Sequence, residues 1–263
     1  MGILNITPDS FSDGGTYYDA AMAVEHAISM VENGADIIDV GGESTRPGSD
    51  PVSLDEELRR VIPVIRSLAG ELEVPISIDT YKSEVAREAI DAGASIVNDI
   101  SGLRFDSEMA NVVAEHQIPV VIMHIKGTPK NMQKDPIYGN LIDEIRVYLK
   151  ESINIATEAG VHEDKIIVDP GIGFGKTYED NLEIIKRLDE LKDIGRPILI
   201  GPSRKAFIGR ILGDLPFSER IEGTAAAIAV SIINGANIVR VHDVKEMSRV
   251  TRVADAIKSG IIV

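Results

Sequence analysis

The chain has 263 residues, with 27 Lys and Arg against 42 Asp and Glu, a formal net charge of −15 and no cysteine. The negative charge argues against nucleic acid or an anionic membrane surface as a partner of the whole molecule. The absence of cysteine excludes disulfides, thiolate nucleophiles and cysteine-bound metals, and it suits a reducing cytoplasm. No apolar stretch approaches the roughly 20 residues of a membrane span, and the N-terminus lacks a basic signal region. We therefore expect a cytoplasmic enzyme.

Eight short apolar runs follow one another along the chain, and segments with helical periodicity separate them. Their length and their content of β-branched residues are typical of buried strands. The runs cover residues 2–4, 35–40, 74–78, 94–97, 118–123, 165–168, 197–200 and 237–241. Eight strands that alternate with helices predict an α/β fold with one domain over residues 1–263, a (β/α)8 TIM barrel, which typically has about 250 residues. Its active site is expected at the C-terminal ends of the strands.

A short pattern recurs where a helix is expected to lead into a strand. Residues 34–39, 93–98 and 235–240 each consist of Gly-Ala, a polar residue, two β-branched residues and a final polar residue. A looser copy begins at Gly160 and ends at Asp169. The glycine is expected to end a helix in the left-handed conformation. Any unit of helix and strand could look like this, so the pattern supports the fold and leaves its last residue free to carry a function.

A polar or charged residue ends each apolar run or lies beside it. These residues are Asn5, Asp39, Asp79, Asn98, His124, Asp169, Ser203 and Arg240. Asp79, Asn98 and Asp169 would place two carboxylates and an amide around one pocket, which suits a flat heterocycle with amino and ring N–H groups. Lys205 could bond the acceptor atoms of that ring or stack on its face. Each residue alone could instead cap the helix that follows it.

Cationic residues gather after the last two predicted strands. Arg240 and His242 alternate along the final strand, so both side chains are expected on the same side. With Arg204 and Lys205 they would form an anion site where many barrels bind phosphate. The alternative for His242 is a structural histidine with satisfied hydrogen bonds. Asn5 ends the first strand, which lies beside the eighth in a closed barrel, and its amide oxygen could hold a Mg2+ ion that carries phosphate.

Two polar segments are longer than the usual turns of such a barrel. Residues 7–16 and 41–53 follow the first two strands and are expected to be mobile loops, with ordinary connecting loops as the alternative. Residues 126–140 form a third irregular stretch. Residues 171–176 are rich in glycine but lack P-loop spacing, so we expect a turn that lets the backbone approach a ligand, with Phe174 either at that ligand or in the core.

Two of the strand-end residues have less certain parts in this scheme. Asp39 is interpreted as structural support for the second loop. His124 either lines the pocket or caps the fifth strand.

Motifs at seven places resemble dihydropteroate synthase, a family of pterin-binding TIM barrels. They cover residues 1–15, 39–48, 77–80, 97–102, 169–175, 203–205 and 240–242. Long motifs at seven places are far more specific than the barrel architecture. The resemblance implies a transferase of folate biosynthesis that moves an alkyl group other than methyl and is the target of sulfonamides. It would join 6-hydroxymethyl-7,8-dihydropterin diphosphate to p-aminobenzoate, with Mg2+ as cofactor, and release pyrophosphate and 7,8-dihydropteroate.

The resemblance also implies roles for individual residues. The pterin would contact Asp79, Asn98, Met123, Asp169, Phe174 and Lys205. The diphosphate would contact Asn5, Thr45, Arg240 and His242, and the Mg2+ ion would be bound by Asn5. The p-aminobenzoate would contact Phe11, Arg46, Pro47 and Lys205. The catalytic residues would be Asp9, Lys205, Arg240 and His242.

In the family the carbon–oxygen bond to the diphosphate loosens before the amine attacks, which leaves a cationic pterin methylene. Mg2+, Arg240 and His242 would stabilise the departing pyrophosphate. The first two loops would exclude water and build the p-aminobenzoate slot, and Asp9 would lie near the cation. Ala206 replaces a serine that many members carry, so N–H groups at the start of the next helix would hold the p-aminobenzoate carboxylate. The first strand begins at Met1, where members usually have a preceding segment, so we expect either less cover over the barrel bottom or a sequence trimmed at this end.

Family members are generally dimeric, so a homodimer through the helices of the seventh and eighth units is expected. Residues 225–233 offer an apolar face there, with core packed against the barrel as the alternative. The remaining partners would be the two small-molecule substrates. A pterin-binding methyltransferase would share the pterin pocket but would need neither diphosphate nor Mg2+, and Asn5, Arg240 and His242 argue against it. A catalytically silent pterin-binding paralogue would have no need of Lys205 or the two loops.

Overall fold

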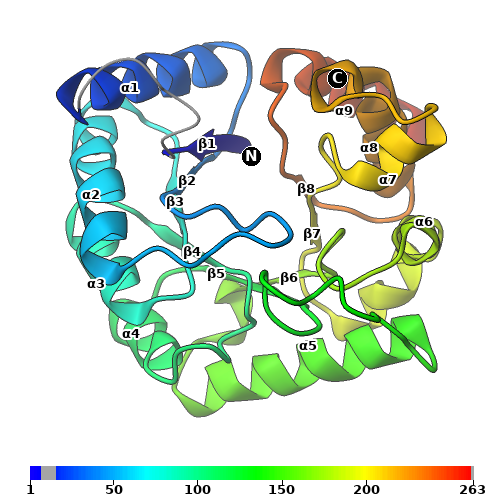
Figure 1. The fold of residues 1–263 in the computed structure, drawn as a ribbon, viewed down its shortest axis with the longest axis horizontal. Helices are drawn as coiled ribbons and strands as arrows, with labels where there is room; N and C mark the ends of the chain where they lie inside the picture. The colour runs from blue at the N-terminus through cyan, green and yellow to red at the C-terminus, as the bar shows by residue number, and fades with distance from the viewer. Residues whose placement is uncertain (7–15, 262–263) are drawn as a thin grey trace.

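A computed structural model describes the protein over residues 1–6 and 16–261. Strands and helices alternate along it (Figure 1). The strands are β1 (Gly2–Asn5), β2 (Ile38–Gly41), β3 (Ile76–Asp79), β4 (Ile96–Asp99), β5 (Val120–Met123), β6 (Ile166–Asp169), β7 (Leu199–Ile200) and β8 (Ile238–Val239). The α-helices are α1 (Thr16–Glu32), α2 (Leu54–Glu71), α3 (Ser83–Asp91), α4 (Met109–His116), α5 (Leu141–Glu158), α6 (Tyr178–Lys186), α7 (Ala206–Ile211), α8 (Ile221–Ile233) and α9 (Val244–Ser259). The 3-10 helices are η2 (Glu163–Lys165), η3 (Leu188–Ile194) and η4 (Phe217–Glu219).

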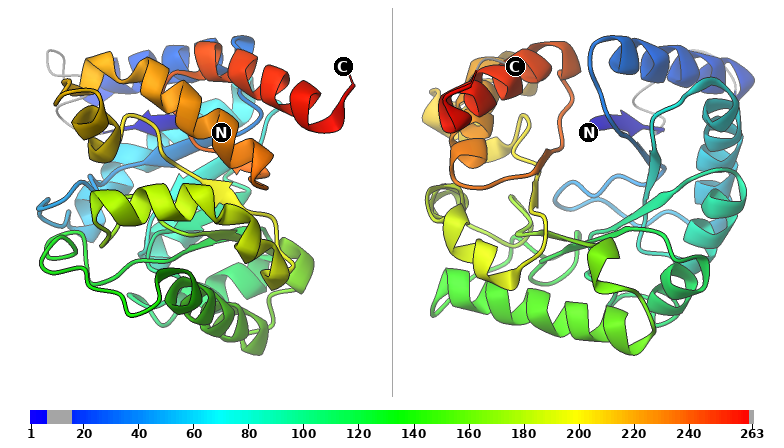
Figure 2. Two further views of the ribbon diagram at one scale, coloured as in Figure 1. Left: turned by 90° about the vertical axis from the view of Figure 1, so that its right-hand side faces the viewer. Right: turned by 180° about the vertical axis from the view of Figure 1, so that it is seen from behind.

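The strands of the described chain form a closed barrel. β1 to β6 make a parallel sheet in sequence order, and β7 pairs in parallel with β8. Two single bridges close the ring, because Val168 pairs with Ile198 before β7 and Gly2 pairs with Val241 after β8. The helices surround this ring (Figure 1, Figure 2). The predicted (β/α)8 TIM barrel is confirmed, while the single domain over residues 1–263 stays a prediction. None of the described helices is long and apolar enough to cross a membrane.

Most strands begin later than the apolar runs that predict them, and before β2, β4 and β8 the chain is still bonded to the preceding helix. The repeated glycines have positive φ angles, at Gly34 (99°), Gly93 (118°), Gly160 (101°) and Gly235 (119°). After Gly34, the N–H of Ala35 donates back to the carbonyl of Met30 at 2.9 Å. This is the Schellman bond that ends a helix, and β2 begins only at Ile38. The helix-ending role predicted for these glycines is confirmed.

Alternation along the strands stacks two layers of side chains inside the barrel. The first is an apolar cluster of Met1, Ile96, Val121 and Leu199 with the partly buried Ile37, Ile167 and Ile238. Two residues further along the same strands, a polar layer follows with Asp39, Asn98, Asp169 and Arg240. A side-chain period of two keeps both layers on the inner face of the barrel. The polar groups therefore lie over an apolar floor, at the C-terminal ends of the strands.

Candidate active site

A hydrogen-bonded network crosses the barrel mouth from β2, β3 and β4 to the residue after β8. Arg240 donates from Nε to Asp39 Oδ2 at 2.5 Å and from Nη2 to Asp79 Oδ2 at 2.6 Å. Asn98 Nδ2 donates to the same oxygen of Asp39 at 3.0 Å. Asp39 is fully buried. It therefore holds two residues of the mouth, rather than the second loop that the sequence interpretation favoured.

Burial sets the protonation of the acidic side chains at the mouth. It raises the pKa of Asp79 to about 7, with Arg240 opposing this rise and Asp39 adding to it. Burial also raises the pKa of Asp169 to about 6, while a hydrogen bond from the Gly171 N–H opposes the rise. Within the described residues, Asp79 Oδ1 has no hydrogen-bond partner. A buried acceptor without a donor costs roughly 1–3 kcal/mol, so Asp79 favours a ligand that brings an N–H group.

The glycine-rich segment after β6 forms a tight turn, as predicted. Gly171, Gly173 and Gly175 have φ angles of 72°, 83° and 64°, a region that only glycine enters at little cost. A Cβ atom on Gly171 would lie 2.0 Å from the carbonyl oxygen of His124. Asp169 Oδ1 accepts the N–H of Gly171 at 2.6 Å. The turn thus fixes one oxygen of this carboxylate and brings backbone close to the mouth.

Phe174 and Met123 belong to a small apolar cluster beside the polar network. The other fully buried members are Ile100, Ile125 and Met132. Nζ of Lys205 lies 4.3 Å from the centre of the Phe174 ring, the geometry of a cation–π contact. Burial, together with the charge of Arg240, lowers the pKa of Lys205 to about 8. Phe174 is therefore both part of a core and the surface against which the Lys205 ammonium lies.

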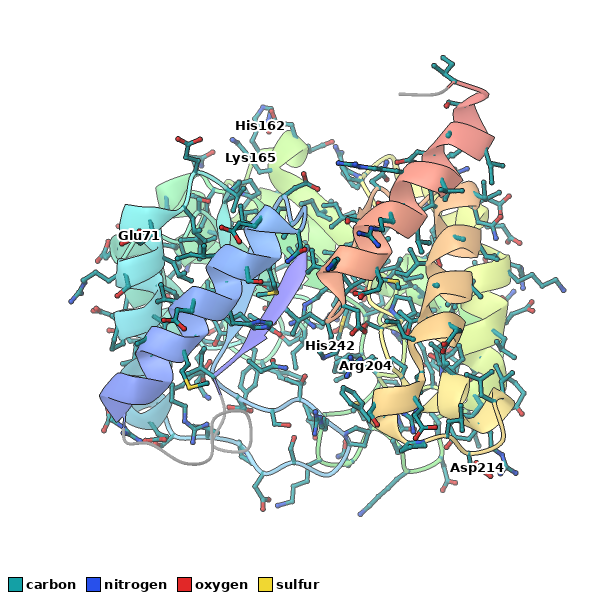
Figure 3. All side chains as sticks on the ribbon, turned by 90° about the horizontal axis from the view of Figure 1, so that it is seen from above. Glu71, His162, Lys165, Arg204, Asp214 and His242 are labelled. Carbon is teal, nitrogen blue, oxygen red and sulfur yellow. The ribbon has the colours of Figure 1, made fainter. Side chains whose placement is uncertain are left out.

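Arg204 turns away from the cations that the sequence grouped with it. It has a φ of 56°, and its Nε donates to Asp243 Oδ2 at 2.8 Å. Its guanidinium lies 5.0 Å from the centre of the Phe217 ring. Figure 3 shows Arg204 and His242 toward one end of the barrel, with His162 at the opposite end. The expected anion site therefore loses Arg204, because the local turn directs this side chain to Asp243.

His242 is held as a neutral hydrogen-bonding group. Its Nδ1 lies 3.0 Å from Ser203 Oγ, which also accepts the backbone N–H of His242 at 3.1 Å. The hydroxyl proton of Ser203 is then free for Nδ1, and this network assigns the ring proton of His242 to Nε2. Burial, followed by the charge of Arg240, lowers the pKa of His242 to about 3. Near neutral pH this residue donates an N–H bond but brings no charge.

Asn5 ends β1 and lies in register with Gly41 of β2. A Cβ atom on Gly41 would lie 3.6 Å from Asp79 Oδ2 and 3.7 Å from Asn5 Oδ1. The missing side chain at Gly41 thus leaves space beside both oxygens. Over residues 1–6 and 16–261, no group of three or more His, Cys, Asp and Glu side chains could hold a metal ion. A metal ion at Asn5 would take most of its ligands from phosphate and water, an arrangement that Mg2+ accepts.

The second loop reaches over the mouth toward the segment after α7. Thr45 is half-buried, and Arg46 and Pro47 are exposed. The Arg46 guanidinium lies 5.3 Å from the centre of the Phe217 ring. The predicted contacts of the first loop fall on Asp9 and Phe11. Both residues lie outside the part of the chain that the structure describes.

Sequence reasoning missed Lys176, which is almost completely buried. Its Nζ lies 2.9 Å from His124 Nδ1 and 3.0 Å from the carbonyl oxygen of Phe174. Burial lowers the pKa of Lys176 to about 7 and that of His124 well below its ordinary value. Lys176 thus links the backbone of the glycine-rich turn, at Phe174, to His124 at the end of β5. The available sequence signal was a lysine directly after three closely spaced glycines.

His124 lines a hollow, but this hollow is not the pterin pocket expected at the mouth of the barrel. The hollow has a volume of about 420 Å3 and lies beside α5. Its other lining residues include Lys126, Tyr138, Glu144 and Tyr148. None of the residues predicted to bind pterin, diphosphate or p-aminobenzoate lines it. His124 therefore belongs to the layer between the barrel and α5.

Comparisons with known proteins agree with this geometry. Residues 1–242 match the family described as "Pterin binding enzyme". The dihydropteroate synthase of Synechocystis sp. is 52% identical over 257 residues, which cover 98% of this chain and 89% of the relative. The crystal structure of dihydropteroate synthase from Clostridium difficile in the presence of pteroic acid aligns with a TM-score of 0.93 at 51% identity, covering 98% of this chain and 95% of that one. The Yersinia pestis dihydropteroate synthase with a sulfonamide drug complex aligns with a TM-score of 0.93 at 42% identity, covering 98% and 94%.

Proposed function

This chain belongs to the dihydropteroate synthases, a family of pterin-binding enzymes, and on that premise we propose that it joins 6-hydroxymethyl-7,8-dihydropterin diphosphate to p-aminobenzoate. The products are 7,8-dihydropteroate and pyrophosphate. The enzyme is thus a transferase of an alkyl group other than methyl, in folate biosynthesis. The observation that carries the proposal is the buried polar layer of the mouth. The carboxylates of Asp79 and Asp169 and the amide of Asn98 lie in it or beside it, and the ammonium of Lys205 lies near it on the ring of Phe174.

The acidic side of the mouth would bind the pterin ring. Asp79 Oδ1 lacks a donor among the described residues, and Asp169 has a second oxygen beyond the one that Gly171 occupies. These oxygens match the amino and ring N–H groups of a pterin. Asn98 gives its N–H to Asp39, which leaves its amide oxygen as an acceptor. The ammonium of Lys205 would donate to the acceptor atoms of the ring, between the walls formed by Phe174 and Met123.

The diphosphate would lie over β8 and the start of β1. Arg240 donates from Nε and Nη2 to two carboxylates, so its Nη1 N–H groups would remain to donate to phosphate oxygens. His242 would donate its Nε2–H, and the hydroxyl of Thr45 would donate from the second loop. Because the cation of Arg240 is held by two acids, it is preorganised toward a leaving group whose negative charge grows during the reaction.

We also propose that Asn5 binds the Mg2+ ion that accompanies the diphosphate. The space beside Gly41 and the amide oxygen of Asn5 fit an ion with one protein ligand. The chemistry that Mg2+ supplies when bound is neutralisation of charge on the phosphate oxygens. This proposal rests on the donor type and the space around it.

In the proposed reaction the bond from the pterin methylene carbon to the diphosphate oxygen breaks as pyrophosphate leaves. The amine nitrogen of p-aminobenzoate then forms a bond to that carbon and releases one proton. Arg240 and His242 would stabilise the leaving oxygen, and Lys205 would hold the ring in line. Asp9 would face the cationic methylene. Exclusion of water by both loops would protect that carbon from hydrolysis.

The p-aminobenzoate would bind between the second loop and the start of α7. Its walls would be Phe11 and Pro47, with Arg46 beside them. Its carboxylate would face Lys205 and the backbone N–H groups that begin at Ala206, the first residue of α7. A sulfonamide would occupy the same slot.

One assay tests the proposed function. Pyrophosphate release is measured with the pterin diphosphate, p-aminobenzoate and Mg2+, and each is left out in turn. Release that needs all three is expected. Binding of the pterin without release would instead support the silent paralogue. The methyltransferase would also give no release, and a separate assay that supplies a methyl donor would detect it.

A homodimer is proposed through α8 and α9. Exposed apolar residues on these helices include Val230, Ile233, Val253 and Ile257. A charged substitution such as Val230→Asp should shift the sedimentation coefficient from that of a dimer to that of a monomer. A cytoplasmic location stays a prediction from the absence of cysteine.

A further inference from the structure

Four buried or partly buried side chains at the base of the second loop have no part in the proposed reaction. We call Glu43, Glu57, Tyr81 and Lys82 the loop anchor. Lys82 Nζ donates to Glu43 Oε2 at 2.6 Å and also bonds Glu57 of α2. The hydroxyl of Tyr81 donates to Glu43 Oε1 at 2.7 Å. Both oxygens of Glu43 are thus held by residues that directly follow Asp79 and Thr80 in the chain.

Glu43 also closes the second loop on itself. Its Oε2 accepts the N–H of Val52 at 3.1 Å. One step further along the loop, Ser49 Oγ donates to the carbonyl of Ser44 at 2.5 Å. The two cross-links are nested, and both enclose residues 45–47. The carboxylate of Glu43 is therefore the point at which both ends of the loop are fixed to the barrel.

Tyr81 joins this point to the pterin side of the mouth. Its ring packs against the apolar cluster that contains Met123 and Phe174. Its ring centre also lies 5.5 Å from that of Phe105, in an edge-on arrangement. One rigid side chain thus packs with its ring against the cluster that includes the proposed pterin wall and bonds the loop with its hydroxyl.

We propose that Tyr81 and Lys82 are positioning residues that set the second loop, and with it the p-aminobenzoate slot, from the pterin side of the mouth. This inference rests on the proposed function, because residues 45–47 carry part of that slot. It predicts that damage to the loop anchor weakens the use of p-aminobenzoate and spares the binding of pterin.

The charges of the loop anchor decide which variant is informative. Two buried carboxylates share the single ammonium of Lys82, and Glu57 Oε1 has no partner within the described residues. Removing Lys82 would leave both charges unpaired and endanger folding. Tyr81→Phe removes only one hydroxyl and keeps the ring packing. It is therefore the primary test.

Tyr81→Phe is expected to raise the KM for p-aminobenzoate about tenfold, because a hydrogen bond to a charged group is lost. The KM for the pterin diphosphate and kcat should stay within about twofold of wild type. Two controls are matched to it. Tyr148→Phe removes another tyrosine hydroxyl, which donates to the Ser101 carbonyl at 2.5 Å. Lys130→Met removes an exposed ion pair between the same loop and its surroundings, with Asp50. Both controls should keep the KM for p-aminobenzoate.

An unchanged KM for p-aminobenzoate in Tyr81→Phe, or equal increases for both substrates, would overturn the inference. Hydrogen exchange at the amides of residues 43–52 tests it without turnover. Tyr81→Phe should speed this exchange at least about fivefold relative to wild type and to Tyr148→Phe, since a local opening becomes easier. Unchanged exchange also rejects the loop anchor. A wild-type protein that releases no pyrophosphate would reject the proposed function alone.

Discussion

The mouth of the barrel has two halves that differ in charge and in the way they are held. The acidic half lies on a continuous six-stranded sheet and carries Asp39, Asp79, Asn98 and Asp169. The cationic half lies on or beside β7 and β8 and carries the cations of Lys205 and Arg240 together with the neutral His242. These two strands have two residues each, and single bridges join them to their neighbours. Ladders of three or four residue pairs between neighbouring strands fix the acidic half. The cationic half has only a short ladder, in which the Arg240 N–H donates to the Ile200 carbonyl at 3.0 Å, and the side-chain bonds of Arg240 to Asp39 and Asp79 add to it.

Arg240 connects the halves. Although burial opposes its charge, Asp39 and Asp79 raise its pKa. A cation buried beside two acids is stable only while both partners remain. The comparison therefore predicts that a change of Arg240 lowers both the stability and the use of the diphosphate. A change of Arg204 or Lys205 should affect only stability or only ligand binding, respectively.

The largest effect is expected for Arg240→Met. The variant would leave two buried carboxylates unpaired, so the free energy of unfolding should fall by about 3–5 kcal/mol. Its kcat/KM for the pterin diphosphate should fall about a hundredfold or more. Urea unfolding and steady-state kinetics measure both. Arg204→Met, which breaks the more exposed pair with Asp243, should cost only about 1 kcal/mol. Equal losses in the two variants would break the comparison.

A smaller effect is expected for Lys205→Met. This change removes a cation without leaving a carboxylate unpaired, so stability should change little. The Kd for the pterin, measured by calorimetry, should rise about thirtyfold because charged hydrogen bonds to the ring are lost. Lys165→Met, at the opposite end of the barrel (Figure 3), serves as control. An unchanged Kd in Lys205→Met would remove this residue from the pterin site.

Asn5→Ala tests the junction between the two halves. The Mg2+ concentration for half-maximal activity should rise about tenfold, because the one proposed protein ligand is lost. Saturating Mg2+ should restore most of the turnover. Asn33→Ala, an asparagine that bonds the carbonyl of Ser29 in its own helix region, should leave the Mg2+ dependence unchanged. The same Mg2+ dependence in both variants would contradict the assignment.

The smallest effect is a change with pH in the acidic half. Pterin affinity should rise a few-fold as pH rises through about 6 and 7, where Asp169 and Asp79 ionise. Stability should move the other way. The folded pKa of Asp79 lies above its ordinary value of 3.8, so the folded state holds more protons between these values. The contribution of Asp79 to stability therefore falls as pH rises from about 4 to 7.

Unfolding and calorimetry at matched pH values check both trends. Asp79→Asn cannot ionise at this position, so the stability of wild type relative to this variant should decline with rising pH. A relative stability that rises over the same interval would show that Asp79 has a lowered pKa in the folded protein.

The sequence was sufficient for features that depend on neighbours along the chain. The apolar runs and the four repeated glycines predicted the barrel, because both record local backbone preferences. Strand-end positions predicted which polar residues share the mouth, since parallel strands end at one face. The seven motifs predicted the family, because each is a short segment and their order along the chain can be read directly from the sequence.

Only the tertiary structure decided which charges meet. Arg240 bonds Asp39 and Asp79, which precede it by 201 and 161 positions, whereas its expected companion Arg204 bonds Asp243. Lys176 is buried against His124 rather than exposed in its turn. The sequence gives the charged residues but not the distances between them. For residues so far apart along the chain, the pairing depends on closure of the barrel and on the close approach that Gly41 and Gly171 allow. Electrostatic energy depends on distance and burial, so the roles of these side chains were fixed only when the strands closed around them.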